Sequence, residues 1–145
     1  MSLARLGARP TPSAVGLLDV PLGVWLYGVR RGDAVVGLDN FNDFYDPRLK
    51  EENRALLERH AAFSLVRGSI LEPATLERAL TPRPDAVIHL AAWAGVRPSI
   101  ERPALYTREN VDGTVAVLEA LRARPDGAGK LPRLVFASSS SVYGT

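Results

Sequence analysis

Three clusters of polar or small side chains, each directly after a run of apolar residues, equip this sequence for binding or chemistry. Asp39 and Asn40 follow AVVGL, the small-residue stretch 91–95 (AAWAG) follows DAVIHL, and the hydroxyl cluster 138–141 (SSSS) follows LVFA. An acid that ends a strand can accept hydrogen bonds from the hydroxyls of a ribose. Small side chains let a flat ligand lie against the backbone, and hydroxyls can hold a substrate oxygen.

Each cluster also has a purely structural explanation. Asp39 with Asn40 fits a turn at the end of a strand, and AAWAG fits close helix packing. His89, inside an apolar run, is expected to be a hydrogen-bonded core residue. Four consecutive hydroxyls exceed the needs of a turn and are costly to bury unpaired, so we expect some to face a polar ligand. They lie in no G-x-S-x-G sequence, which favours hydrogen bonding over nucleophilic catalysis.

The elements that must position these clusters are strands buried on both faces. Their apolar runs are nearly continuous, whereas a half-exposed strand would alternate. Such strands belong to parallel sheets that are covered by helices, and open α/β sheets bind ligands at the carboxyl ends of their strands. We expect strands over residues 34–38, 63–66, 85–92 and 131–137.

Amphipathic helices are predicted between these strands. They cover residues 47–62, 73–80 and 102–124. In the last of them, spacings of four, three and three indicate one apolar face, made of Val111, Val115, Leu118 and Leu121. The order β-α-β-α-β-α-β predicts a doubly wound, Rossmann-like α/β sheet.

The first 33 residues depart from this pattern. A doubly wound nucleotide-binding domain begins with a strand, a glycine-rich turn and a helix, but no G-x-G-x-x-G or G-x-x-G-x-x-G spacing occurs here. Pro21 falls where the helix should be under way, at a cost of about 3 kcal/mol in a helix interior. We therefore divide the chain into an atypical opening segment, 1–33, and the remainder of the domain, 34–145.

Composition excludes several classes of function. The 145 residues contain no Cys, which removes disulfides, Cys-ligated zinc and iron–sulfur clusters, and the two His are too few for most histidine-rich metal sites. A net charge of +2 without a basic stripe gives no reason to expect nucleic acid as a partner. The apolar stretch 14–29 is interrupted by Asp19 and Pro21, so we expect a cytoplasmic protein that does not enter a membrane.

Three ordered stretches carry a family resemblance: GLDNFNDFYDPRLK (37–50), PDAVIHLAAWAGVRPSIERPALYTRENVDGT (84–114) and LVFASSSSVYG (134–144). They resemble the extended short-chain dehydrogenase/reductase family and its NAD-dependent nucleotide-sugar epimerases and dehydratases. DNFNDFYDPRLK and AGVRPSIE are similar to the UDP-glucuronate 4-epimerases in particular. Three motifs in order are more specific than a lone glycine signature. The resemblance implies NAD as cofactor, a nucleotide sugar as substrate and a homodimer.

The resemblance also implies roles for particular residues. Ser139, with Ser141 beside it, matches the serine that hydrogen-bonds the reacting sugar hydroxyl. Arg97 lies in the loop that approaches the substrate, and Asn110 matches the asparagine that supports the active-site backbone. The remaining implied positions are Asp39, Asn40, Asn42, Ser69, Ile70, Leu90, Ala91, Ala92 and Ser138 for the cofactor, and Ser140 for the substrate.

The sequence departs from the family in three places. PTPSAVGLLDVPL occupies residues 10–22, where T-G-x-x-G-F-I-G is expected, and Ser69 follows Gly68 where the family has an acid that assists adenine recognition. The catalytic Tyr-x-x-x-Lys pair would lie beyond Thr145, and Tyr143 is not that tyrosine. We therefore expect the amino-terminal part of a nucleotide-sugar 4-epimerase (UDP-glucuronate/UDP-galacturonate type) that binds NAD weakly or not at all and is inactive alone. A dehydratase of the same family, and a truncated or frame-shifted remnant acting only as a binding module, are the alternatives.

Overall fold

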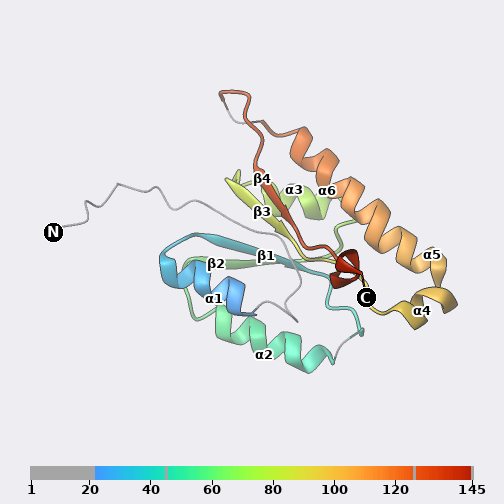
Figure 1. Ribbon diagram of the computed structural model, residues 1–145. Coiled ribbons are helices and arrows are strands. Elements are labelled where there is room, and N and C mark those ends of the chain that lie inside the picture. The colour runs from blue at the N-terminus through green and yellow to red at the C-terminus, as the bar shows by residue number, and fades with distance from the viewer. Residues whose placement is uncertain (1–21, 45, 126, 145) are drawn as a thin grey trace.

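The computed structural model describes residues 22–44, 46–125 and 127–144, in which helices and strands alternate (Figure 1). The strands form close to where the sequence predicts them. In chain order the elements are α1 (Leu22–Arg31), β1 (Val35–Asp39), α2 (Pro47–Leu57), β2 (Phe63–Arg67), α3 (Pro73–Leu80), β3 (Ala86–His89), α4 (Val96–Glu101), α5 (Pro103–Tyr106), the π-helix η1 (Thr107–Asp112), α6 (Gly113–Arg122), β4 (Arg133–Phe136) and the 3₁₀-helix η2 (Ser140–Tyr143).

The strands form two parallel pairs. β1 pairs with β2, with Val35 opposite Phe63 and Asp39 opposite Arg67, and β3 pairs with β4, with Ala86 opposite Arg133. Parallel neighbours need a crossover connection. α2 makes the crossover between β1 and β2, and the helices from α4 to α6 make the one between β3 and β4. The carboxyl ends of both strands of a pair therefore lie at the same edge.

Side chains that alternate along β1 and β3 pack into two separate cores. Val36 and Leu38 of β1 share one apolar cluster with Val87 of β3 and with side chains of α3 and α6. Val35 belongs to the other cluster, with side chains of α1 and α2, and Ile88 packs against it. Since successive strand residues point to opposite faces, helices cover both faces of the strand layer. This confirms the doubly wound, Rossmann-like class (Figure 1).

The helix that follows α4 changes its winding along its length. α5 continues into the π-helix η1 and then into α6, whose first residue is Gly113. A Cβ at Gly113 would lie 2.6 Å from Cδ1 of Ile70, in the loop after β2. Glycine thus lets this helix approach that loop closely, and the close approach brings η1 to the carboxyl end of β2.

The apolar face predicted for this helix was wrong. Gly113, Val117 and Leu121, spaced four apart, are the buried positions of α6. Three of the four residues predicted to be buried are between 46% and 55% exposed, namely Val111, Val115 and Leu118. The helix is apolar on more than one side, so the spacing alone allows two stripes. The stripe that contains Gly113 is buried because it fits closely against Ile70.

Burial on both faces holds for β1 and fails for β4. All five residues of β1 are buried, whereas Val135 and Phe136 of β4 are each 55% exposed. Within the part of the chain that the structure describes, β4 pairs only with β3. An apolar run in the sequence shows that a strand can be buried on both faces. It does not show whether other strands or helices pack against those faces.

Most of the predicted opening segment lies outside the described residues, including the stretch 10–21 of the expected glycine-rich turn. The described part begins with α1, whose Trp25 and Val29 are buried beside Val35 of β1. No helix in the described ranges is long and apolar enough to cross a membrane.

Candidate functional site

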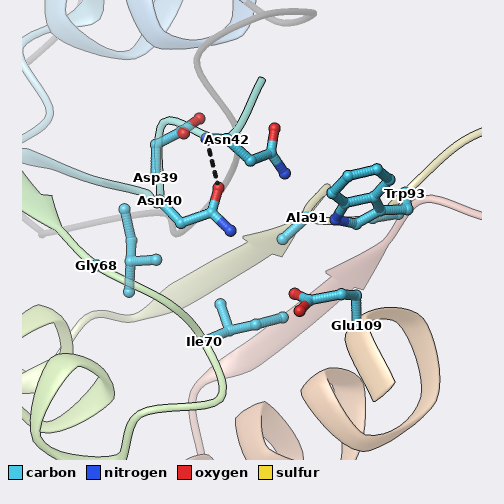
Figure 2. Close-up of a pocket in the computed structure, with 10 residues that line it drawn as sticks. Asp39, Asn40, Asn42, Gly68, Ile70, Ala91, Trp93 and Glu109 are labelled. Atoms are coloured by element: carbon cyan, nitrogen blue, oxygen red, sulfur yellow. Dashed lines mark hydrogen bonds between the residues drawn. The ribbon is translucent and has the colours of Figure 1, made fainter. Parts of the chain in front are cut away.

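Two hollows lie at the carboxyl ends of the strands and share the wall formed by residues 91–93. We call them the Asp39 pocket (Figure 2) and the serine cleft, a cavity of about 550 Å³. The Asp39 pocket brings together six residues predicted from the sequence: Asp39, Asn40, Asn42, Ile70, Ala91 and Ala92. The serine cleft brings together Leu90, Ala91, Ala92, Asn110, Ser138 and Ser139.

Asp39 is held by a buried charge pair at the end of β1. Its Oδ1 lies 3.3 Å from Nζ of Lys50, on α2, and both side chains are fully buried. The same Nζ donates to Oδ1 of Asn42 at 3.2 Å. Two buried charges stabilise each other only when further hydrogen bonds satisfy them. Lys50 therefore joins α2 to the loop that follows β1.

That loop is built from consecutive turns of the type predicted for Asp39 and Asn40. The Phe41 N–H donates to Oδ1 of Asp39 at 2.6 Å, and the Asn42 N–H donates to Oδ1 of Asn40 at 3.1 Å. Figure 2 shows both Asn side chains beside Asp39 at the rim of the pocket. The turns do not exclude a ligand-binding role, because they orient the side chains of Asp39, Asn40 and Asn42 along the pocket.

The floor of the Asp39 pocket requires glycine at position 68. Its φ is +153°, and a Cβ there would lie 2.5 Å from Oγ1 of Thr75. Ile70 completes the floor. Ser69, predicted as a cofactor contact, lines neither hollow. Its Oγ accepts the Leu71 N–H at 3.1 Å, so it serves the local turn.

Trp93 forms the wall shared by the two hollows and is fixed from several sides. The Asn110 side chain accepts from the Trp93 N–H at 2.7 Å and donates to its carbonyl oxygen at 2.9 Å. The indole packs edge-on against Phe44 and Tyr106, with ring centroids 5.2 and 6.2 Å away. The hydroxyl of Tyr106 also donates to the carbonyl oxygen of Ala94 at 2.6 Å. Asn110 thus supports the backbone between the two hollows.

His89 lines the serine cleft as a neutral core residue. The Thr114 hydroxyl donates to the Asn110 carbonyl oxygen at 2.6 Å, and its Oγ1 lies 2.9 Å from Nε2 of His89. A hydroxyl carries one proton, so Oγ1 must accept from Nε2–H. Burial lowers the pKa of His89, which keeps the ring neutral. The prediction of a hydrogen-bonded core histidine is confirmed, and Nδ1 has no partner within the described ranges.

The remaining residues predicted to meet the substrate are Arg97, Ser140 and Ser141. Arg97, on α4, is exposed and lines neither hollow. Ser140 and Ser141 begin η2, and their side chains fall outside the described part. Tyr143 is 91% exposed.

Sequence reasoning missed Leu38 and Gly68 of the Asp39 pocket and, with them, three residues whose side chains carry polar chemistry in the pocket or support it. Lys50 is the buried partner of Asp39, and Trp93 and Glu109 line the pocket. Trp93 could have been found, because a large aromatic residue interrupts the small-residue stretch AAWAG. Lys50 and Glu109 lie in charged segments, and no local pattern separates them from solvated charges.

Comparison with known proteins covers most of the described part of the chain. The pattern of the NAD dependent epimerase/dehydratase family matches residues 27–145. UDP-glucuronate 4-epimerase 3 of Arabidopsis thaliana is 49% identical over 116 residues, which are 79% of this chain and 26% of that protein. The chain therefore spans about a quarter of the length of that protein and of two related UDP-glucuronate 4-epimerases of the same plant.

Solved structures agree with this relationship. UDP-glucuronic acid 4-epimerase from Bacillus cereus, in complex with UDP-glucuronic acid and NAD, superposes with a TM-score of 0.78 at 30% identity, covering 92% of this chain and 42% of that chain. UDP-glucose 4-epimerase from Brucella ovis, in complex with NAD, gives a TM-score of 0.68 at 28% identity, covering 93% and 38%.

Proposed function

The chain belongs to the NAD dependent epimerase/dehydratase family, and from that premise we propose that it is the amino-terminal, NAD-binding part of a nucleotide-sugar 4-epimerase that acts on UDP-glucuronate or UDP-galacturonate. The wall shared by the Asp39 pocket and the serine cleft supports this most directly. A dinucleotide is an extended ligand with a nucleoside at each end. The small side chains of Ala91 and Ala92 would let it pass from one hollow to the other along the strand ends.

The described residues fit the adenosine end of NAD. Asp39 ends β1, where dinucleotide folds place the acid that accepts the ribose hydroxyls. The Phe41 N–H and Lys50 fix the orientation of its carboxylate, which lines the pocket. Asn40 and Asn42 add amides at the same rim. The residues that would meet the pyrophosphate fall in the opening segment, outside the described part.

The serine cleft suits the reacting end of the sugar. NAD, when bound, supplies the hydride acceptor for the sugar carbon C4. We assign to Ser139 the hydrogen bond that orients the reacting hydroxyl, with Ser138 and Ser141 beside it. Arg97 and Ser140 would contact the remainder of the substrate. Asn110 keeps the shared wall in place by bonding both backbone groups of Trp93.

These 145 residues contain no Tyr-x-x-x-Lys sequence, and this favours a second candidate, a binding module without turnover. We propose that this chain alone does not epimerise, because loss of general acid/base catalysis costs about 10²- to 10⁴-fold. The dehydratase alternative shares the first hydride step and differs in acid/base groups. The homodimer and the cytoplasmic location stay predictions. Val115 and Leu118 of α6 are exposed, and a second copy of the chain could cover them.

Calorimetric titration with NAD and NADP tests the proposal. We expect NAD to bind more weakly than micromolar, because the glycine-rich turn is absent from the sequence, yet more tightly than NADP. Asp39→Asn should weaken NAD by about tenfold or more through loss of a charge-assisted hydrogen bond, and should narrow the NAD preference by removing the charge that repels a 2′-phosphate. Asp43→Asn, in the same loop but exposed, is the matched control.

Two results would contradict this proposal. Equal affinity of the unaltered chain for NAD and NADP would remove the ribose role of Asp39. Conversion of UDP-glucuronate by the purified chain, abolished by Ser139→Ala, would show that these residues suffice for catalysis. Product chromatography after incubation with NAD measures the second outcome.

A further inference from the structure

Glu109 presents a second carboxylate to the Asp39 pocket. It lies on the π-helix η1, lines the pocket and is only 12% exposed. Figure 2 shows its carboxylate on the other side of the pocket from Asp39, directed toward the space between Ile70 and Ala91. π-Helical segments are frequent at functional sites. Here the segment holds a nearly buried acid beside an apolar floor.

The protein satisfies this carboxylate poorly. Its one described partner is Arg108, whose Nη2 lies 3.2 Å from Oε1 and whose side chain is 66% exposed. Residues adjacent in a helix do not face each other, and an exposed guanidinium contributes little to an ion pair. Among the described residues, Oε2 has no donor. Oε2 is therefore available to a hydrogen-bond donor that a ligand brings into the pocket.

Trp93 presents the complementary group to the same pocket. Its indole Nε1–H is buried and has no hydrogen-bond partner among the residues that the structure describes. The ring cannot easily turn to find one, because Phe44 and Tyr106 pack against it and Asn110 holds its backbone. The pocket thus offers an acceptor at Glu109 and a donor at Trp93, around the apolar side chains of Ile70 and Ala91. A flat heterocycle that carries both an amine and a ring nitrogen matches this set.

We propose that Glu109 recognises the exocyclic amine of the adenine ring of NAD, while Nε1–H of Trp93 donates to a ring nitrogen. The inference rests on the proposed function and extends it from the ribose to the base. Asp39 would select the sugar, and Glu109 would select adenine over a base without the amine. Glu109 would thereby supply the acid that is absent at Ser69, whose hydroxyl accepts the Leu71 N–H.

Nicotinamide hypoxanthine dinucleotide tests this proposal, because it replaces the adenine amine by a carbonyl oxygen and changes nothing at the ribose. Both dinucleotides are titrated into the ¹⁵N-labelled chain, and NMR follows the indole N–H signals of Trp93 and Trp25. We expect NAD to bind about tenfold more tightly, as loss of a hydrogen bond to a charged group predicts, and we expect the Trp93 signal to shift with NAD.

Glu109→Gln is the decisive variant, because it keeps the shape of the side chain and can donate to the hypoxanthine oxygen. In this variant the affinities for NAD and for nicotinamide hypoxanthine dinucleotide should differ by no more than about twofold, or their order should reverse. Glu119→Gln, which alters an exposed acid of α6, should keep the preference for NAD. Equal affinities in the unaltered chain, or a preference unchanged in Glu109→Gln, would overturn the role of Glu109 and leave NAD binding intact. If neither dinucleotide binds, the proposed NAD site and this inference both fail.

Discussion

The Asp39 pocket and the serine cleft share a wall but are built in opposite ways. In the pocket, Asp39 and Lys50 are fully buried and joined to each other. In the cleft, Ser138 and Ser139 are exposed and extend from β4, whose Phe136 is 55% exposed. The proposed nucleotide end of the site is therefore part of the core, whereas the proposed sugar end lies on the surface. Substitution of Asp39 or Lys50 should therefore cost stability, and substitution of Ser138 or Ser139 should not.

The largest change in the free energy of unfolding is expected when the buried charge pair is broken. Lys50→Met leaves the Asp39 carboxylate buried without its cation, which should lower the free energy of unfolding by about 3–5 kcal/mol. Ser139→Ala should change it by no more than about 0.5 kcal/mol. Urea unfolding followed by tryptophan fluorescence measures both variants.

Lys130→Met is the control, because Lys130 is the other lysine of the chain and is exposed. The double variant Asp39→Asn/Lys50→Met should recover part of the loss, since it removes both charges. If Lys50→Met and Ser139→Ala unfold at the same urea concentration, the distinction between a structural pocket and a surface cleft is lost.

An intermediate effect is expected where η1 and α6 meet the pocket floor. Gly113→Ala places a methyl group 2.6 Å from Cδ1 of Ile70. Overpacking costs about 1–3 kcal/mol, which exceeds the helix-propensity gain of up to about 1 kcal/mol. Ile70→Val removes that Cδ1 atom, so Gly113→Ala should be tolerated better in the Ile70→Val background. Thermal melting of the four proteins gives the coupling.

Gly127→Ala provides the baseline for this cycle, because a Cβ there meets no atom within 4 Å. A Gly113→Ala protein as stable as Gly127→Ala would show that the helix does not need its close approach to Ile70. The placement of Glu109 in the pocket would then lose its structural explanation.

The smallest expected effect concerns His89 and pH. Burial lowers the pKa of His89 in the folded chain, so between that lowered pKa and the ordinary value near 6.5 the unfolded state binds more protons. Stability should therefore rise with pH across this window, by at most about 1.4 kcal/mol per pH unit, and fall as the solution is acidified below about pH 6.5. His89→Gln should flatten this part of the profile. If His89→Gln left the dependence of stability on pH unchanged, the burial of His89 would not be the cause of that dependence.

The sequence predicts those parts of the molecule in which local pattern and final environment coincide. Strands could be located because apolar runs end at polar or small residues, and Asp39 and Ala91 could be placed because strand ends of a parallel sheet share one edge. Lys50 could not be paired with Asp39, because only the packing of α2 buries it. Glu109 could not be separated from Asp112, since the π-winding of η1 decides which acid faces the pocket and hydrophobic periodicity does not encode that winding.

The exposed apolar side of β4 also bears on how the protein behaves in concentrated solution. Val135 and Phe136 are each 55% exposed, on a strand that pairs on one side only within the described residues. An unpaired apolar strand edge is a template for pairing with a second chain, and natural proteins limit this with charges and prolines. Here Pro132 and Arg133 stand at the start of the strand. Self-association should therefore begin at the carboxyl end of β4, beside the serine cleft, where neither safeguard is present.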